Sequence, residues 1–384
     1  MHETAEGAEL FFHMWQFESR IVATLELEEQ GVGQILVGPV TVEDGATGGG
    51  VMAATTTPGT KAALFSVYPP HALALQRLGV DGTGGPVVPL SVDVGPAVFG
   101  GHVAPAEGPG GGEHLVTYAH FTPAGNGPHL EPRVALFDED AQLTHGPAML
   151  ETPPEHLGAF GSLSSIWVDD HALTAVARSA CWSPEACGPA VAVHRSIPAT
   201  GGQLEASTVW THEAPDESQA ALAERDGRVW IALYDGNNDV AKLKLWELAA
   251  DGSIMAGPVT VDTGQTPGSP ASPPLGWGGP GLTLVATPWG LVASAMKLTE
   301  QSPPSGALVM AEIGVVHLGF DLQTLSPPVT IPVVDPSQHS PPRLVATADG
   351  AVVVWEARGL PQDAPFSGPN NAGRVHLARL VCEP

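Results

Sequence analysis

Short runs in which apolar and polar residues alternate recur along the whole chain and predict β-strands. From Ala241 to Trp246 the alternation has a period of two, as in a strand with one buried face. Near the end of the chain, two β-branched runs flank Asp349-Gly350, and glycine supplies the positive φ that a tight hairpin turn needs. Helical periodicity is almost absent. The pattern therefore predicts an all-β protein.

One apolar run in each part of the chain ends in an aromatic residue or a substitute for it. These run ends lie 50 to 62 residues apart and include all three tyrosines. They are Trp15, Tyr68, Tyr118, Ala177, Tyr234, Met296 and Trp355. Repeats of this length are typical of propeller blades. Gly-Pro steps open several of the outermost strands, where proline is tolerated at a sheet edge. We therefore predict a β-propeller of seven blades with four antiparallel strands each.

The repeat divides the chain into units of one propeller domain, residues 1–384. The expected units are 1–45, 46–94, 95–155, 156–215, 216–264, 265–338 and 339–384. The first unit is expected to begin with its second strand at Leu10, and the last to stop after its third strand at Leu380. One first strand and one fourth strand are thus missing from the predicted pattern, which leaves the closure of the ring open.

The last unit also carries a resemblance to a known class of proteins. From Pro342 to Trp355 it reads Pro-x-Leu-x-Ala-x-x-Asp-Gly-x-Val-x-Val-Trp. This arrangement resembles the degenerate repeat of secreted bacterial β-propeller proteins, and the likeness covers essentially the whole chain. The resemblance implies the propeller fold and indicates no activity.

Charge excludes some partners. Lys and Arg number 15 and Asp and Glu 41, which gives a formal charge of −26. Nucleic acids are bound mainly through basic side chains, so neither they nor anionic membranes are expected partners. No apolar stretch is long enough to span a membrane, and we expect a monomer. Because 43% of the residues are hydrophobic, a large core is expected.

The cysteines bear on the compartment. Cys181 and Cys187 are separated by five residues, a spacing that suits a small disulfide loop and does not suit a Cys-x-x-Cys zinc or redox motif. A disulfide there would indicate a secreted or periplasmic protein, whose signal peptide is not part of this sequence. Two reduced thiols are the alternative. Cys382 has no assigned role.

The loops between second and third strands suggest where a ligand would bind. They share a propeller face with the connections between blades, and we expect them at 122–132, 179–189, 235–239, 299–306 and 359–373. Trp182, Trp277 and Trp289 lie near loops and are candidate ligand contacts. Loops of uneven length also arise when their sequences change without functional constraint, which explains them without a ligand. The first functional hypothesis is a non-enzymatic extracytoplasmic propeller that binds a protein, peptide or small ligand on this face.

Each of six predicted fourth strands ends in an acidic residue. These residues are Glu43, Asp93, Glu151, Glu213, Asp262 and Asp335. A ring of carboxylates would make one face strongly negative. Acidic residues also favour turns, which explains the same positions without a functional site.

Histidines and one acidic loop are candidate ligands for a divalent metal or calcium. His102, His156 and His339 lie in or just before first strands and could bind zinc or copper from equivalent channel positions. Ordinary surface or hydrogen-bonded histidines are the alternative. Asp235, Asn237 and Asp239 match the first ligand positions of a calcium loop, although the later positions do not match and a simple turn explains them.

No sequence motif for a catalytic site is present. The second functional hypothesis is nevertheless a propeller enzyme of the lyase or hydrolase type that uses channel histidines and carboxylates, with or without a metal.

Overall fold

The protein is described by a computed structural model. It describes residues 2–4, 7–16, 19–27, 33–42, 51–57, 60–67, 72–78, 84–95, 98–106, 113–124, 127–150, 160–178, 191–213, 219–235, 242–265, 282–298, 310–336, 342–347, 350–359 and 374–381. These residues form strands and turns and no helix, and the strands make a propeller arrangement of antiparallel sheets, which confirms the predicted fold class. No helix that could cross a membrane occurs in these ranges.

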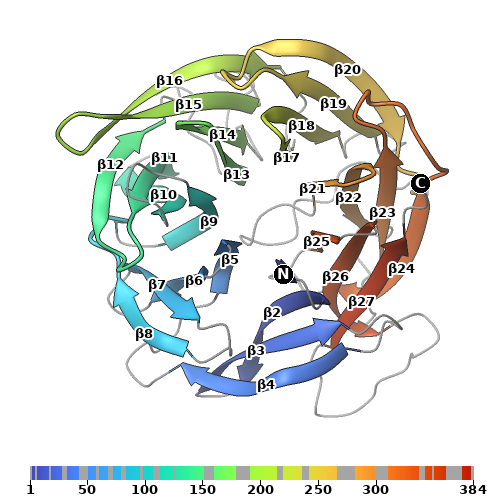
Figure 1. Cartoon of the computed structure of the whole chain (residues 1–384), viewed down its shortest axis with the longest axis horizontal. Coiled ribbons are helices and arrows are strands. Elements are labelled where there is room, and N and C mark those ends of the chain that lie inside the picture. The colour runs from blue at the N-terminus through green and yellow to red at the C-terminus, as the bar shows by residue number, and fades with distance from the viewer. Residues whose placement is uncertain are drawn as a thin grey trace. The chain divides into compact units, whose positions relative to one another are not determined.

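Five of the sheets contain four consecutive strands each (Figure 1). They are β1 (His2–Thr4), β2 (Gly7–Gln16), β3 (Ser19–Leu27) and β4 (Gly33–Val42); β5 (Val51–Thr57), β6 (Thr60–Val67), β7 (Ala72–Leu78) and β8 (Gly84–Pro89); β9 (Val98–Ala106), β10 (Glu113–Ala124), β11 (Gly127–Phe137) and β12 (Leu143–Met149); β13 (Phe160–Val168), β14 (His171–Arg178), β15 (Val191–Ala199) and β16 (Gln203–His212); and β17 (Gln219–Arg225), β18 (Arg228–Asp235), β19 (Lys242–Leu248) and β20 (Ile254–Asp262).

The remaining strands form one seven-stranded sheet. It contains β21 (Thr283–Thr287), β22 (Gly290–Leu298), β23 (Met310–Leu318), β24 (Val329–Pro336), β25 (Arg343–Thr347), β26 (Gly350–Gly359) and β27 (Arg374–Val381). Strand β24 pairs with β26 through Val334 opposite Gly359 and Pro336 opposite Ala357. The sequence predicted seven separate sheets, and this pairing joins the last two of them into one.

The start of the chain also differs from the expectation. The sequence predicted that the first unit begins with its second strand, whereas the structure has β1, a short first strand of three residues. His2 of β1 lies opposite Glu9 of β2, and Thr4 lies opposite Gly7. A strand this short gives no periodic signal in the sequence, because alternation needs about four residues to be recognised.

The chain forms two compact units. The first comprises Met1–Ala159, Leu163–Thr174 and Val193–Val209, and the second Phe160–Ser162, Ala175–Ala192 and Trp210–Pro384. In the first unit, a buried apolar cluster joins strands β7, β9, β10 and β11. Its members are Leu73, Leu75, Leu90, Val94, Val103, Val116, Tyr118, Ala135, Phe137 and Ala141. Complete burial of a side chain such as Phe137 contributes about 1.5–3 kcal/mol.

One face of the β10–β11 hairpin changes from apolar to polar along its length. Alternate residues of a strand share a face, so Val116, Tyr118 and His120 line one face of β10. On β11 their direct cross-strand partners are Ala135, Arg133 and Glu131. Val116, Tyr118 and Ala135 belong to the buried cluster. The next pair, His120 and Glu131, therefore continues the core face toward the end of the hairpin.

The equivalent hairpin in the second unit, β22–β23, keeps its apolar character. Met296 and Ile313 are directly paired, and both belong to a buried cluster. The next pair in the same direction is Leu298 with Ala311, and Ala311 is only 1% exposed. This hairpin provides an internal reference for the polar one.

Candidate functional site

A tight turn between β8 and β9 positions the carboxylate of Asp93. The Asp93 Oδ1 atom accepts a hydrogen bond of 2.9 Å from the backbone N–H of Gly95. Gly95 has a φ of 74°, which glycine adopts at little cost. The N–H of Gly95 and, next, the hydrogen bond with His120 lower the pKa of Asp93 below its ordinary value. Asp93 is therefore negatively charged at neutral pH.

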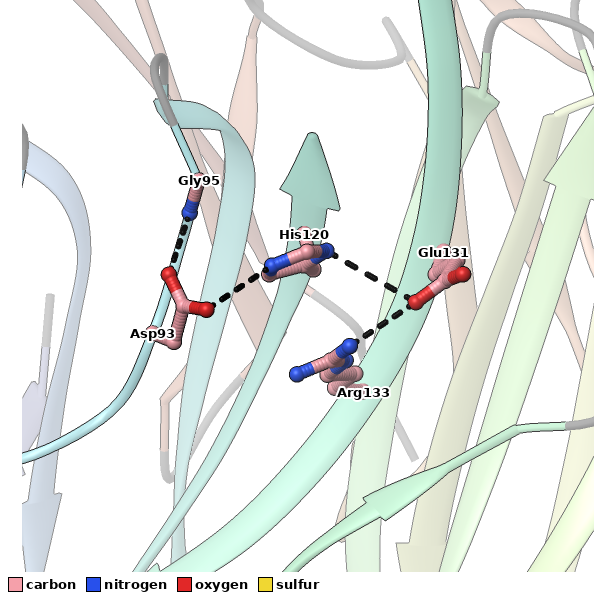
Figure 2. A network of polar contacts seen from close by, with 5 residues as sticks. All are labelled: Asp93, Gly95, His120, Glu131 and Arg133. Carbon is pink, nitrogen blue, oxygen red and sulfur yellow. Dashed lines mark hydrogen bonds and ion pairs between the residues drawn. The ribbon is translucent and has the colours of Figure 1, made fainter. Parts of the chain in front are cut away.

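The imidazole of His120 lies between two carboxylates (Figure 2). Its Nε2 atom is 3.3 Å from Asp93 Oδ2, and its Nδ1 atom is 3.6 Å from Glu131 Oε2. His120 and Glu131 are direct cross-strand neighbours, whereas Asp93 comes from the loop that precedes β9. The site thus combines a rigid pair on the hairpin with a carboxylate from a turn.

Arg133 holds the Glu131 side of this network. Its Nη2 atom donates a hydrogen bond of 2.8 Å to Glu131 Oε2. Tyr118 lies opposite Arg133 in the same hairpin and is fully buried. Burial raises the pKa of Tyr118 to about 12, against the opposing effect of the Arg133 guanidinium. Tyr118 therefore stays neutral at physiological pH. Glu131 is held in place by the charge-assisted hydrogen bond from Arg133.

Exposure differs sharply across the site. The side chain of His120 is 12% exposed and that of Asp93 is 78% exposed, while Glu131 and Arg133 are each 23% exposed. The Nε2 edge of the imidazole thus lies beside a solvent-exposed carboxylate, and the Nδ1 edge faces the more buried Glu131. A molecule that arrives from solvent on this side would meet the Asp93 carboxylate first.

This arrangement can transfer protons. Histidine is the side chain that most often serves as a general acid or base, and a carboxylate at one ring nitrogen orients the ring and stabilises its charged form. Glu131, held by Arg133, lies 3.6 Å from Nδ1, beyond hydrogen-bond distance but near enough to stabilise a positive charge on the ring. Among the residues with a described position, no group of three His, Cys, Asp or Glu side chains has the geometry to hold a metal ion.

The second unit contains the same turn with different surroundings. The Asp262 Oδ1 atom accepts a hydrogen bond of 2.7 Å from the N–H of Gly264, whose φ is 71°. The next residue, Gln265, is buried and donates from Nε2 to the carbonyl oxygens of Ala295 at 3.0 Å and Glu312 at 2.7 Å. Its Oε1 atom accepts from Tyr234 and Thr263. In the second unit, the turn is therefore followed by a buried side chain, Gln265, that ties it to neighbouring strands through hydrogen bonds.

Three of the residues selected from the sequence have described positions. His102 is half-buried in β9 and lies opposite Thr117. Asp235 is the last residue of β18. Trp289 is 41% exposed in the turn between β21 and β22. That turn is at the opposite end of its sheet from the loop between the second and third strands, so Trp289 does not lie on the predicted binding face.

The other selected residues lie outside the described part of the chain. They are Trp182, Trp277, His156, His339, Asn237, Asp239, Cys181 and Cys187. The three-histidine metal site, the calcium loop and the disulfide therefore remain predictions.

Sequence reasoning selected Asp93 as a strand-end acid but missed His120, Glu131 and Arg133. Glu131 was missed because 122–132 was predicted as a loop, whereas β10 continues to Ala124 and β11 begins at Gly127. A usable signal was present: His120 stands two residues after Tyr118, one of the recurring run ends, and alternate strand residues share a face. The site does lie at the predicted end of its sheet, where the β8–β9 connection meets the β10–β11 hairpin.

Comparison with known proteins gives similarity of fold at low sequence identity. No protein-family model matches the sequence, and a search of curated proteins found no match. An alpha-L-arabinanase of Penicillium chrysogenum complexed with arabinobiose is 11% identical, with a TM-score of 0.48 over 85% of this chain and 93% of that chain. A thermostable family-43 glycoside hydrolase is 11% identical, with a TM-score of 0.38 over 74% of this chain and 96% of that one.

A third similar structure is a polysaccharide lyase of family PL25, an ulvan lyase bound to its saccharide. It is 11% identical, with a TM-score of 0.41 over 78% of this chain and 71% of that chain. These three structures are propeller glycoside hydrolases and a lyase. None of the three is described as a non-enzymatic binding protein, so the expectation of such a protein gains no support from the comparison and is not maintained.

Proposed function

We propose that this protein is an enzyme of the hydrolase or lyase type in which His120 is the general acid and base. The observation that supports the proposal is the position of the His120 imidazole, with Nε2 3.3 Å from the exposed carboxylate of Asp93 and Nδ1 3.6 Å from Glu131. Glu131 and Arg133 are positioning residues, since they act through the orientation of the imidazole.

His120 would carry one proton through the reaction. In a hydrolysis, Nε2 gives its proton to the leaving oxygen and later takes one from the attacking water, so that one water is consumed and the histidine is restored. In an elimination, the imidazole takes a proton from carbon and returns it to the leaving oxygen, with no water consumed. Both reactions would use Nε2, the ring nitrogen beside the exposed carboxylate of Asp93.

A two-readout assay on purified protein tests this proposal. Neutral and acidic polysaccharides are incubated with the wild-type protein, with new reducing ends as the readout for hydrolysis and ultraviolet absorbance of an unsaturated product for elimination. We expect turnover of at least one substrate, with a loss of about 10²–10⁴-fold in His120→Gln.

The variant also serves as the control for contaminating enzymes, because it is purified in the same way. Its thermal unfolding and circular dichroism must match those of the wild type. Equal rates for wild type and His120→Gln would overturn the role of His120, and an absence of turnover across the panel would overturn the proposed activity.

The proposal places this enzyme outside the cytoplasm, as in secreted bacterial propellers. It is supported by the spacing of Cys181 and Cys187, which suits a disulfide loop. Peptide mapping under non-reducing conditions should recover the two cysteines in one linked peptide. Recovery of both as free thiols from protein exported to the periplasm would contradict this part of the proposal.

A further inference from the structure

The charge at the reacting side of the site is negative. The Asp93 carboxylate is 78% exposed and lies beside His120 Nε2. Its Oδ1 atom is occupied by the N–H of Gly95, whereas Oδ2 faces the imidazole. Any substrate group that reaches Nε2 must therefore approach within a few ångströms of a fixed negative charge. A carboxylate or sulfate on the substrate would be repelled there, and a hydroxyl group could donate a hydrogen bond.

The positively charged side chain of the site, Arg133, already forms an ion pair with Glu131. Arg133 donates a hydrogen bond of 2.8 Å to Glu131, and its charge is directed at that carboxylate. Arginine is the side chain best suited to bind an anionic substrate through two parallel hydrogen bonds. An anionic substrate would therefore meet a guanidinium whose positive charge Glu131 already offsets.

The charge of the whole chain acts in the same direction. With 41 acidic and 15 basic residues, its formal charge is −26. A field of this sign lowers the local concentration of polyanions and slows their association, most strongly at low salt. It has no such effect on an uncharged molecule.

We infer that the substrate of the His120 site is neutral and rich in hydroxyl groups, as an uncharged glycan is, rather than a polysaccharide that carries carboxylates or sulfates. Of the two proposed reactions this substrate suits hydrolysis, because elimination needs a carboxylate to acidify the carbon that loses its proton. The inference rests on the proposed function and deepens it. Asp93 has two roles in this account: it orients the Nε2 edge of His120, and it selects against negative charge at the bond that is cleaved.

Binding measurements on matched panels test this inference separately from turnover. The neutral panel contains arabinan, mannan and galactan oligosaccharides, and the anionic panel contains polygalacturonate, alginate and ulvan oligosaccharides. Isothermal titration at low and at high salt gives the affinities. We expect the best neutral ligand to bind at least about tenfold more tightly than the best anionic one at low salt, with the gap narrowing as salt rises.

Two matched variants assign the effect to Asp93. Asp93→Asn removes the charge but keeps an oxygen that can accept the Gly95 hydrogen bond, and it should narrow the gap between neutral and anionic ligands several-fold. Asp262→Asn makes the same change in the equivalent turn of the second unit and should leave the gap unchanged. If both variants narrowed the affinity gap equally, the preference for neutral ligands would come from the overall charge of the protein. That result would overturn the role of Asp93.

The outcomes separate the inference from the proposed function. Cleavage of an anionic polysaccharide, or tighter binding of one, overturns the inference and leaves the proposed function standing. Binding of a neutral glycan without cleavage removes the proposed reaction and retains the inference. Binding of neither panel overturns the inference.

Discussion

The turn that carries Asp93 and the turn that carries Asp262 have the same local geometry and different consequences. In each, the carboxylate accepts the N–H of a glycine two residues later, at 2.9 Å and 2.7 Å. Each glycine has a positive φ, 74° and 71°. After the first turn Asp93 contacts His120, and after the second Gln265 binds two backbone carbonyls. The turn is a repeated structural element, and its neighbours decide what it does.

The neighbours differ at aligned positions of the two hairpins. In β10–β11 the paired residues are Tyr118 with Arg133 and His120 with Glu131. In β22–β23 they are Met296 with Ile313 and Leu298 with Ala311. One hairpin therefore ends in a polar, partly exposed network and the other in an apolar pair in which Ala311 is buried. A site can arise on this repeat by substitution of a few residues on one face, while the backbone stays the same.

The comparison predicts a large difference between two changes at equivalent positions. Ala311→Glu would place a carboxylate where the native side chain is 1% exposed, at a cost of about 3–5 kcal/mol in the free energy of unfolding. Glu131→Ala removes a carboxylate from a partly exposed network and should cost about 1 kcal/mol. Denaturant unfolding of the two variants measures both values. Similar losses would show that the two hairpin ends do not differ as described.

A second prediction concerns the anchor of the Asp262 turn. Gln265→Ala would leave the carbonyl oxygens of Ala295 and Glu312 without this donor, and we expect a loss of about 2–4 kcal/mol in the free energy of unfolding. Gln323→Ala, at an exposed position in the same unit, is the control and should change stability by less than about 0.5 kcal/mol. Equal stability of the two variants would contradict the anchoring role. Neither change should affect turnover.

The alternation of the sequence was sufficient to predict most strands and the propeller class, because strand period and turn residues are local properties. The residues of the site were harder to predict from the sequence. Asp93 was selected because it ends a predicted strand, although β8 ends at Pro89 and Asp93 lies in the turn that follows. The approach of His120 to Asp93 depends on how this β8–β9 turn folds back on β10. The loop prediction at 122–132 failed because Pro123, Pro128 and Pro132 favour loops locally, whereas the pairing of β10 with β11 extends through all three.

The smallest predicted effect is the pH dependence of stability due to Asp93. Its pKa is lower in the folded protein than its ordinary value of 3.8, so the ionised carboxylate stabilises the fold above that pH. This contribution is lost as the pH falls through the folded-state pKa. Because Asp93 is exposed, the difference in unfolding free energy between wild type and Asp93→Asn should be under about 1 kcal/mol at neutral pH. Unfolding curves from neutral pH to below pH 3.8 measure it, and a difference that persists at the acidic end contradicts this assignment.

Chemical rescue of a His120→Gly variant tests the central claim most directly. The account predicts that turnover falls by about 10²–10⁴-fold and that added imidazole, which can occupy the space of the missing ring and carry its proton, restores at least about tenfold of the loss. Turnover within about twofold of the wild type, or a loss that imidazole does not recover in a correctly folded variant, would contradict the assignment of His120 as the general acid and base.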